Sequence, residues 1–208
     1  SQQTPLFAYW ILILFAGWGG IPNSASVPAW IPALSTIGTV LALLVFVATP
    51  MGACQALGCS FTPVRRNSPL SFFVFGVVAF AISGFARAAV ALFDASPNLH
   101  FTWLTPAINL LNVYGFFAMV MFGAIYIVMP RLLGVGLPWP KLVRFQLWAS
   151  VFGLILMVVP MAIAGIIQTS KLDDAHQPFV NAMRSSLMFL RVTTVGDLLL
   201  LIGHVMFL

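Results

Sequence analysis

Apolar side chains follow one another in six long segments, and the stretches between them carry most of the prolines and charges. Most segments reach the roughly 20 residues that an α-helix needs to cross a bilayer. The first is shorter and carries Trp10 and Trp18 as candidate interfacial anchors. No loop is long enough to bury a core of its own. The pattern predicts one all-α transmembrane domain over residues 1–208, with spans at about 6–20, 28–49, 70–93, 104–129, 143–167 and 187–208.

Composition supports a membrane protein and argues against a nucleic-acid partner. Charged residues make up 6% of the chain and hydrophobic residues 61%, whereas a soluble domain carries about 25% charged residues. The net charge of +5 would suggest nucleic acid in a soluble protein. Here most charges lie between apolar segments, where they report membrane topology. We therefore expect lipids and other membrane subunits as partners, and no nucleic acid.

The loop charges also predict an orientation. The loops after the second and fourth segments are purely basic, whereas the loops on the other side are uncharged, acidic at Asp94, or mixed. Basic loops stay in the cytoplasm. Both termini are therefore expected on the cytoplasmic side of a bacterial-type inner membrane. The basic residues are Arg65, Arg66, Arg131, Lys141 and Arg144.

Four ionisable residues fall inside the apolar segments: Arg87 in the third, and Arg191, Asp197 and His204 in the sixth. A charge at the centre of a membrane helix costs about 2.5–3.5 kcal/mol on insertion scales, so such residues are functional candidates. Asp197 and His204 are seven residues apart and share a helix face. A proton relay or ion site and a hydrogen bond that fixes helix packing are both compatible with this pattern.

The remaining candidate ligands do not form a metal site. Cys54 and Cys59 lie close together in one loop and lack the second half of a zinc site, so we expect structural or incidental thiols. His100 precedes the fourth segment and is either a ligand or a loop histidine bonded to backbone. His176 lies in a polar loop, where solvation is the simpler interpretation.

The fourth segment carries a motif. Residues 100–110 read HFTWLTPAINL, Tyr114 and Gly115 follow, and residues 129–132 read MPRL. This resembles the tenth helix of the heme-copper oxidase catalytic subunit I, in its cbb-type oxidase and nitric oxide reductase branches, where HGTHLTVAHAH precedes Tyr-Gly and MPRL at the same spacing. Residues 17–30 resemble the end of the seventh helix, and residues 191–203 resemble the last helix of the reductase. The resemblance implies helices seven to twelve of a twelve-helix fold.

The family's metal ligands do not carry over to this chain. The last two motif histidines of the family ligate its hemes, and these positions are Ile108 and Leu110 here. The family's His-His pair should fall within Gly20 to Asn23, where there is no histidine. The cbb-type glutamate falls near Ala86, and His100 matches a family histidine that is not a ligand. Because iron and copper need imidazole or thiolate donors, the resemblance implies no cofactor bound by this chain's own ligands, with heme only in partner subunits.

Three functions remain open. The first is a catalytically degenerate accessory or structural subunit of a respiratory heme-copper oxidase or a related electron-transfer complex. The second is half of a split catalytic core, of a cytochrome c oxidase or nitric oxide reductase, that holds heme or quinone at the seam through residues such as His100 or His204. The third is a small proton-handling or transport protein that uses Arg87, Asp197 and His204. The chain alone is not expected to be catalytic, although its complex is an oxidoreductase.

Overall fold

The computed structural model describes residues 3–21, 26–56, 67–92, 98–134, 139–174, 176 and 178–207. Some residues named above lie outside these ranges, so their predictions stay open. They are Arg65, Arg66, Asp94, Cys59 and the last two positions of the stretch from Gly20 to Asn23.

Within the described ranges all regular structure is helical, which confirms the all-α prediction. One continuous helix comprises α5 (Leu104–Leu110), a π-helical stretch η2 (Leu111–Ala118) and α6 (Met119–Leu133). A short 3-10 helix, η1 (Leu99–Phe101), precedes it. The other helices are α1 (Gln3–Ala16), α2 (Trp30–Ala56), α4 (Ser68–Leu92), α7 (Pro140–Leu172) and α8 (Phe179–Phe207).

Five of these helices are long and apolar enough to cross a membrane, and their lengths run from 25 to 33 residues. The chain is therefore a multi-pass membrane protein. The segment predicted as the first span forms α1, which has 14 residues and is shorter than the roughly 20 residues that a span requires.

Several helices continue past the apolar segments that predicted them. The fifth segment was expected at residues 143–167, and α7 runs from Pro140 to Leu172. Helix ends depend on local stop signals as well as on hydropathy. Pro140 suits a first helical turn, where its missing N–H removes no hydrogen bond. Gly134 ends α6 in the left-handed conformation, with φ of 63°.

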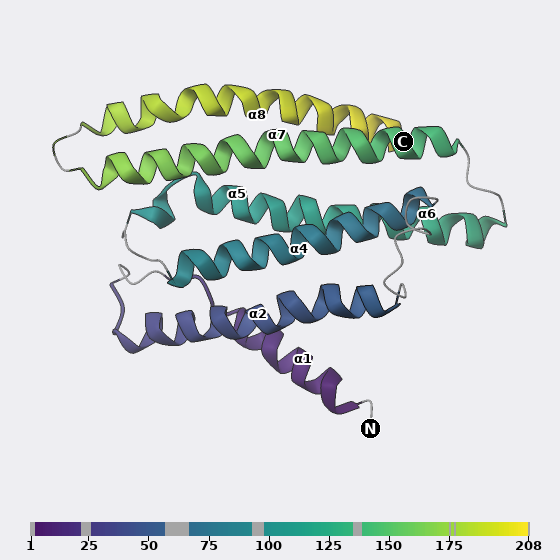
Figure 1. The fold of residues 1–208 in the computed structure, drawn as a ribbon, viewed down its shortest axis with the longest axis horizontal. Helices are drawn as coiled ribbons and strands as arrows, with labels where there is room; N and C mark the ends of the chain where they lie inside the picture. The colour runs from purple at the N-terminus through teal and green to yellow at the C-terminus, as the bar shows by residue number, and fades with distance from the viewer. Residues whose placement is uncertain are drawn as a thin grey trace.

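The long helices run side by side (Figure 1). In this view α7 and α8 form a hairpin at one edge, the α5–α6 helix and α4 follow, and α2 lies beyond α4 with α1 crossing it. A cluster of buried side chains joins α4, α6 and α7. Its fully or largely buried members are Phe72, Met119, Val143 and Leu147.

Close backbone approach holds α7 against its neighbours. A Cβ atom at Gly196 of α8 would lie 2.7 Å from the carbonyl oxygen of Gly153 on α7. A Cβ atom at Gly165 would collide with the backbone of Leu104 at the start of α5. Small residues at such crossings are the usual means by which membrane helices associate, because lipid provides no hydrophobic drive between them.

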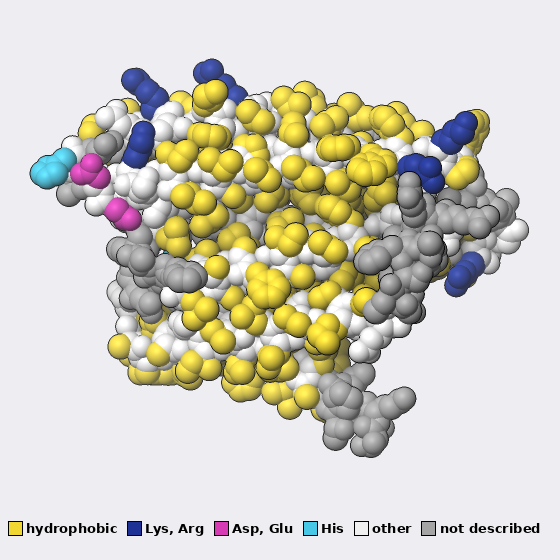
Figure 2. Space-filling model, in the orientation of Figure 1, with side chains coloured by type: hydrophobic (Ala, Val, Ile, Leu, Met, Phe, Trp, Pro, Cys, Tyr) yellow, Lys and Arg dark blue, Asp and Glu magenta, His cyan; other side chains and the backbone are white. Residues whose placement is uncertain are grey.

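Figure 2 shows a broad belt of hydrophobic side chains across the middle of the molecule, with Lys and Arg side chains at its two ends. Such a surface is expected of a protein whose middle is surrounded by lipid and whose two ends are in water. At one of these ends, Cys54 near the C-terminus of α2 is disulfide-bonded. The expectation of a structural or incidental thiol was therefore wrong for Cys54, because a spacing rule for disulfide frameworks does not exclude a single disulfide bond.

Candidate functional site

A cavity of about 500 Å³ lies among α2, α4, α5, η2 and the turn after α1. Its lining combines apolar side chains with hydroxyl, amide, imidazole and guanidinium groups. The lining residues are Gly17, Gly19, Gly20, Ile21, Ser35, Thr36, Thr39, Ala42, Phe46, Arg87, Val90, Ala91, His100, Thr105, Ile108, Asn109 and Asn112.

The turn after α1 forms one wall and is fastened to α2. The backbone N–H of Ile21 donates to the Ser35 hydroxyl over 2.9 Å. Gly38 lets α1 approach closely, because a Cβ atom there would lie 2.9 Å from the carbonyl oxygen of Phe15. Gly20 has φ of +95°, a conformation that suits glycine. Gly20 and Ile21, the described part of the stretch that resembles the family's histidine-pair region, are thus held against α2.

Arg87 is the one permanently charged side chain among the described residues that line the cavity. Its guanidinium Nη2 donates to Oδ1 of Asn109 over 2.6 Å. Its Nε is buried and has no hydrogen-bond partner among the described residues. Asn112, one turn beyond Asn109, also lines the cavity. This wall can donate hydrogen bonds to a polar or anionic group, with Arg87 supplying the charge.

His100 reaches the cavity from η1, just before α5. The segment around it is tied to the end of α7. The Asn98 amide donates to Asp173 over 3.1 Å, and the backbone N–H of Trp103 donates to the fully buried Gln168 over 3.3 Å. Two anchors therefore place His100 opposite the turn after α1.

The two positions that match heme ligands differ in placement. Ile108 is buried and lines the cavity, whereas Leu110 is half-buried and is not part of the lining. Neither side chain has a lone pair to donate. In the described part of the chain, no three His, Cys, Asp or Glu side chains group into a metal site. The donor set therefore does not fit a heme or copper bound in the family's manner.

The other intramembrane candidates lie elsewhere, on α8. His204 faces η2, with its Nε2 3.3 Å from the Tyr114 hydroxyl and its Nδ1 2.5 Å from the Leu200 carbonyl oxygen. Arg191 and Asp197 are exposed on the surface of the chain. No hydrogen bond joins Arg87 to these groups within the described ranges. The structure thus separates Arg87 from the set predicted on the sixth segment.

Sequence reasoning missed the two asparagines and the π-helix. Asn109 lies between Ile108 and Leu110, the two positions that the resemblance assigns to heme ligands, and a search for imidazole and carboxylate groups does not consider an amide. The residues of η2 have ordinary helical composition, so hydropathy does not reveal the change from α to π hydrogen bonding. Such π-helical stretches are often found at functional sites.

Comparison with known proteins gives one family. Residues 1–199 match the family model described as Cytochrome C and Quinol oxidase polypeptide I. Cytochrome c oxidase subunit 1 of Rhodobacter capsulatus is 25% identical over 98% of this chain and 40% of its own length. The subunit CcoN1 of the cbb3-type cytochrome c oxidase of Stutzerimonas stutzeri is 22% identical over 81% of this chain and 36% of its own length.

The chain thus spans about two fifths of the length of these curated relatives. The match nevertheless extends over nearly all of its helices. The chain belongs to the cytochrome c and quinol oxidase polypeptide I family, the subunit I family of the heme-copper oxidases.

Proposed function

We propose that this chain is a catalytically degenerate, subunit I-like structural subunit of a respiratory heme-copper oxidase or a related electron-transfer complex. The carrying observation is Ile108, a hydrocarbon side chain buried in the wall of the cavity at a position that resembles a heme ligand. Leu110, at the second such position, is equally unable to bind iron. Subunits of this family work within respiratory oxidase complexes, and the degenerate chain contributes helices to such an assembly.

The exposed charges of α8 support a membrane partner. Asp197 lies well inside the 29-residue helix, and its side chain is exposed. A carboxylate in lipid at this depth is costly, and aspartate is too short to reach the interface as lysine and arginine do. A helix of another subunit removes this cost if one of its side chains donates a hydrogen bond to the Asp197 carboxylate or forms an ion pair with it. Arg191, six residues earlier, extends the polar surface.

Purification from native membranes in a mild detergent tests the proposal. We expect other membrane subunits to co-purify, and the chain to carry no stoichiometric heme, copper or non-heme iron after separation from them. The catalytic subunit I of the same membranes serves as the positive control for the heme spectrum. Stoichiometric heme on the isolated chain would overturn the proposal, and so would a chain that co-purifies with no other subunit.

A split catalytic core is the second candidate, and the polar cavity favours it. Arg87 and His100 both line a space of about 500 Å³, which a second chain could complete around a heme or a quinone. His100→Ala and His204→Ala test this in the intact complex. A loss of bound cofactor in either variant supports the split core, whereas unchanged cofactor content in both removes it. Gln168→Ala, which loosens the His100 segment, is the structural control.

For orientation, we propose that both termini and the end carrying Arg131, Lys141 and Arg144 lie in the cytoplasm. The basic side chains favour this, whereas the disulfide-bonded state of Cys54 at the same end favours an oxidising compartment. Two separate fusions after Gly134, one to alkaline phosphatase and one to green fluorescent protein, distinguish the cytoplasmic location of this end from the oxidising one. We expect fluorescence without phosphatase activity. Phosphatase activity without fluorescence would reverse the orientation.

A further inference from the structure

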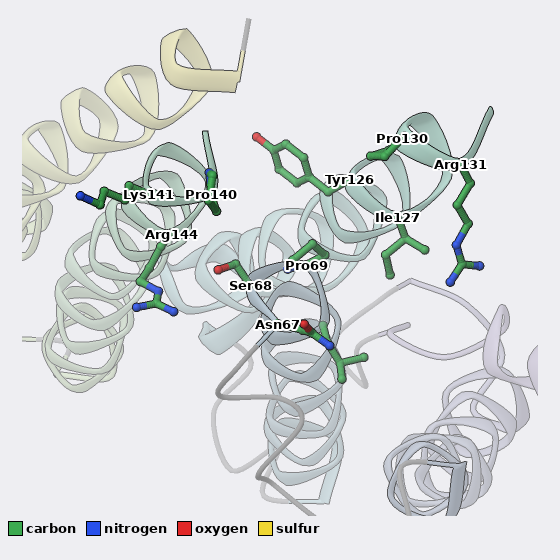
Figure 3. A pocket seen from close by; sticks show the side chains of 11 residues that line it. Asn67, Ser68, Pro69, Tyr126, Ile127, Pro130, Arg131, Pro140, Lys141 and Arg144 are labelled. Carbon is green, nitrogen blue, oxygen red and sulfur yellow. The ribbon is translucent and has the colours of Figure 1, made fainter. Parts of the chain in front are cut away.

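A second hollow lies at the end of the molecule where α4 and α7 begin and α6 ends (Figure 3). Its volume is about 780 Å³. Three basic side chains border it: Arg131 from α6, and Lys141 and Arg144 from α7. No acidic side chain is part of its described lining. The hollow therefore gathers positive charge from two helices that meet at one place.

These charges are not neutralised within the described structure. The side chains of Arg131, Lys141 and Arg144 form no hydrogen bond or ion pair with another described residue. Asp173 and Asp174 follow the far end of α7, and Figure 2 shows acidic side chains only at that opposite end of the visible face. The N-termini of α4 and α7 contribute the positive ends of two helix dipoles, and the C-terminus of α6 contributes a negative end. The hollow is thus suited to an anion.

The walls of the hollow are apolar below this basic border. Leu70 of α4 and Ile127 of α6 line it, together with Pro69 and Pro130. Three candidate membrane spans, α4, the α5–α6 helix and α7, each have one end at this hollow. The hollow therefore lies where a bilayer places its headgroups. A ligand that fits both parts has an anionic head and an apolar tail.

We propose that this hollow binds an anionic phospholipid, with the phosphate at the N-terminus of α4, between the charges of Arg131 and Arg144, and an acyl chain along Leu70 and Ile127. In Figure 3 the two arginines lie on opposite sides of the α4 N-terminus, and Lys141 points away from Tyr126. The two arginines therefore place positive charge on both sides of the α4 N-terminus, and Lys141 adds to the surrounding field. The inference goes beyond the proposed function and does not depend on it.

Native mass spectrometry of the full chain, purified in a neutral detergent, tests this inference. The probes are phosphatidylglycerol and phosphatidylcholine with identical acyl chains. We expect phosphatidylglycerol to bind about tenfold more tightly, and Arg131→Gln with Arg144→Gln to abolish this preference. Lys171→Gln with Arg184→Gln removes the same charge at the opposite end of the molecule and should leave the preference unchanged. Lys141→Gln should weaken it less than the arginine pair does.

Two results would overturn the inference. One is equal binding of both lipids by the unchanged chain, and the other is a preference that survives in the arginine-to-glutamine pair. Displacement of the lipid by an equal concentration of inorganic phosphate or glycerol phosphate would assign the site to a soluble anion, which also overturns it.

Two further measurements serve if the variant with Arg131→Gln and Arg144→Gln does not fold. Arg131→Lys with Arg144→Lys keeps both charges and should keep the preference. In the unchanged chain, raising the salt from about 0.1 M to about 0.5 M shortens the screening length and should reduce the preference several-fold. A preference that is insensitive to salt would contradict an electrostatic site.

Discussion

The α7–α8 hairpin and the group formed by α1, α2, α4 and α5 are built in different ways. The hairpin places glycine against glycine, so that the backbones of Gly153 and Gly196 touch. The other group encloses a polar cavity with a buried arginine Nε that lacks a described partner. A close glycine contact also joins α1 to α2 at Gly38, so the second group combines tight packing with an open space. The open space lies where the motif of residues 100–110 falls, and apolar and amide side chains of that motif line it.

Gly196→Val tests the packed region and should have the largest effect. A Cβ atom at Gly196 already lies 2.7 Å from the Gly153 carbonyl oxygen, so a branched side chain must push α7 and α8 apart. We expect a loss of about 3 kcal/mol in the free energy of unfolding, measured by titration with a denaturing detergent.

Gly52→Val is the matched control, because a Cβ atom at Gly52 of α2 meets nothing within 4 Å. It should change the free energy of unfolding by about 0.5 kcal/mol or less. Equal losses in the two variants would contradict the view that the hairpin depends on close contact.

Asn109→Leu tests the cavity. The change removes the acceptor of the 2.6 Å hydrogen bond from Arg87 and leaves a guanidinium with fewer partners. We expect a loss of about 1.5 kcal/mol by the same titration. Asn112→Leu is the control, since Asn112 lines the cavity without a described side-chain hydrogen bond. A larger loss for Asn109→Leu than for Gly196→Val would reverse the comparison.

Tyr126→Phe should have a smaller effect than Gly196→Val or Asn109→Leu. Its hydroxyl donates to Oε1 of Gln146, a fully buried residue whose Nε2 has no described partner. Removing the hydroxyl leaves the amide without this bond, for an expected loss of about 1 kcal/mol. Tyr114→Phe breaks a longer contact with His204, 3.3 Å, and should cost less. The opposite order would mean that the contact of Tyr114 with His204 contributes more to the free energy of unfolding than the hydrogen bond from Tyr126 to Gln146.

Hydropathy predicted the number and order of the apolar helices, because the cost of exposing polar backbone to lipid dominates their formation. It did not predict their ends, as α7 shows, since those depend on capping residues. The motif in residues 100–110 directed attention to Ile108, which lies in the cavity wall. It could not predict the bond between Arg87 and Asn109, because two residues 22 positions apart meet only when helices pack. The same limit applies to Arg144 and Arg131, which a loop-charge count treats as topology signals.

The eight residues of η2 determine how the halves of the α5–α6 helix are rotated about their common axis. A π-helical turn holds more residues than an α-helical one, so the stretch changes the phase between Asn109 and Tyr126. Deleting one residue within η2 shifts the helix register by about 100°. Asn109 and Tyr126 could then no longer both face their present partners. Insertions and deletions in this stretch are therefore more damaging than most single substitutions.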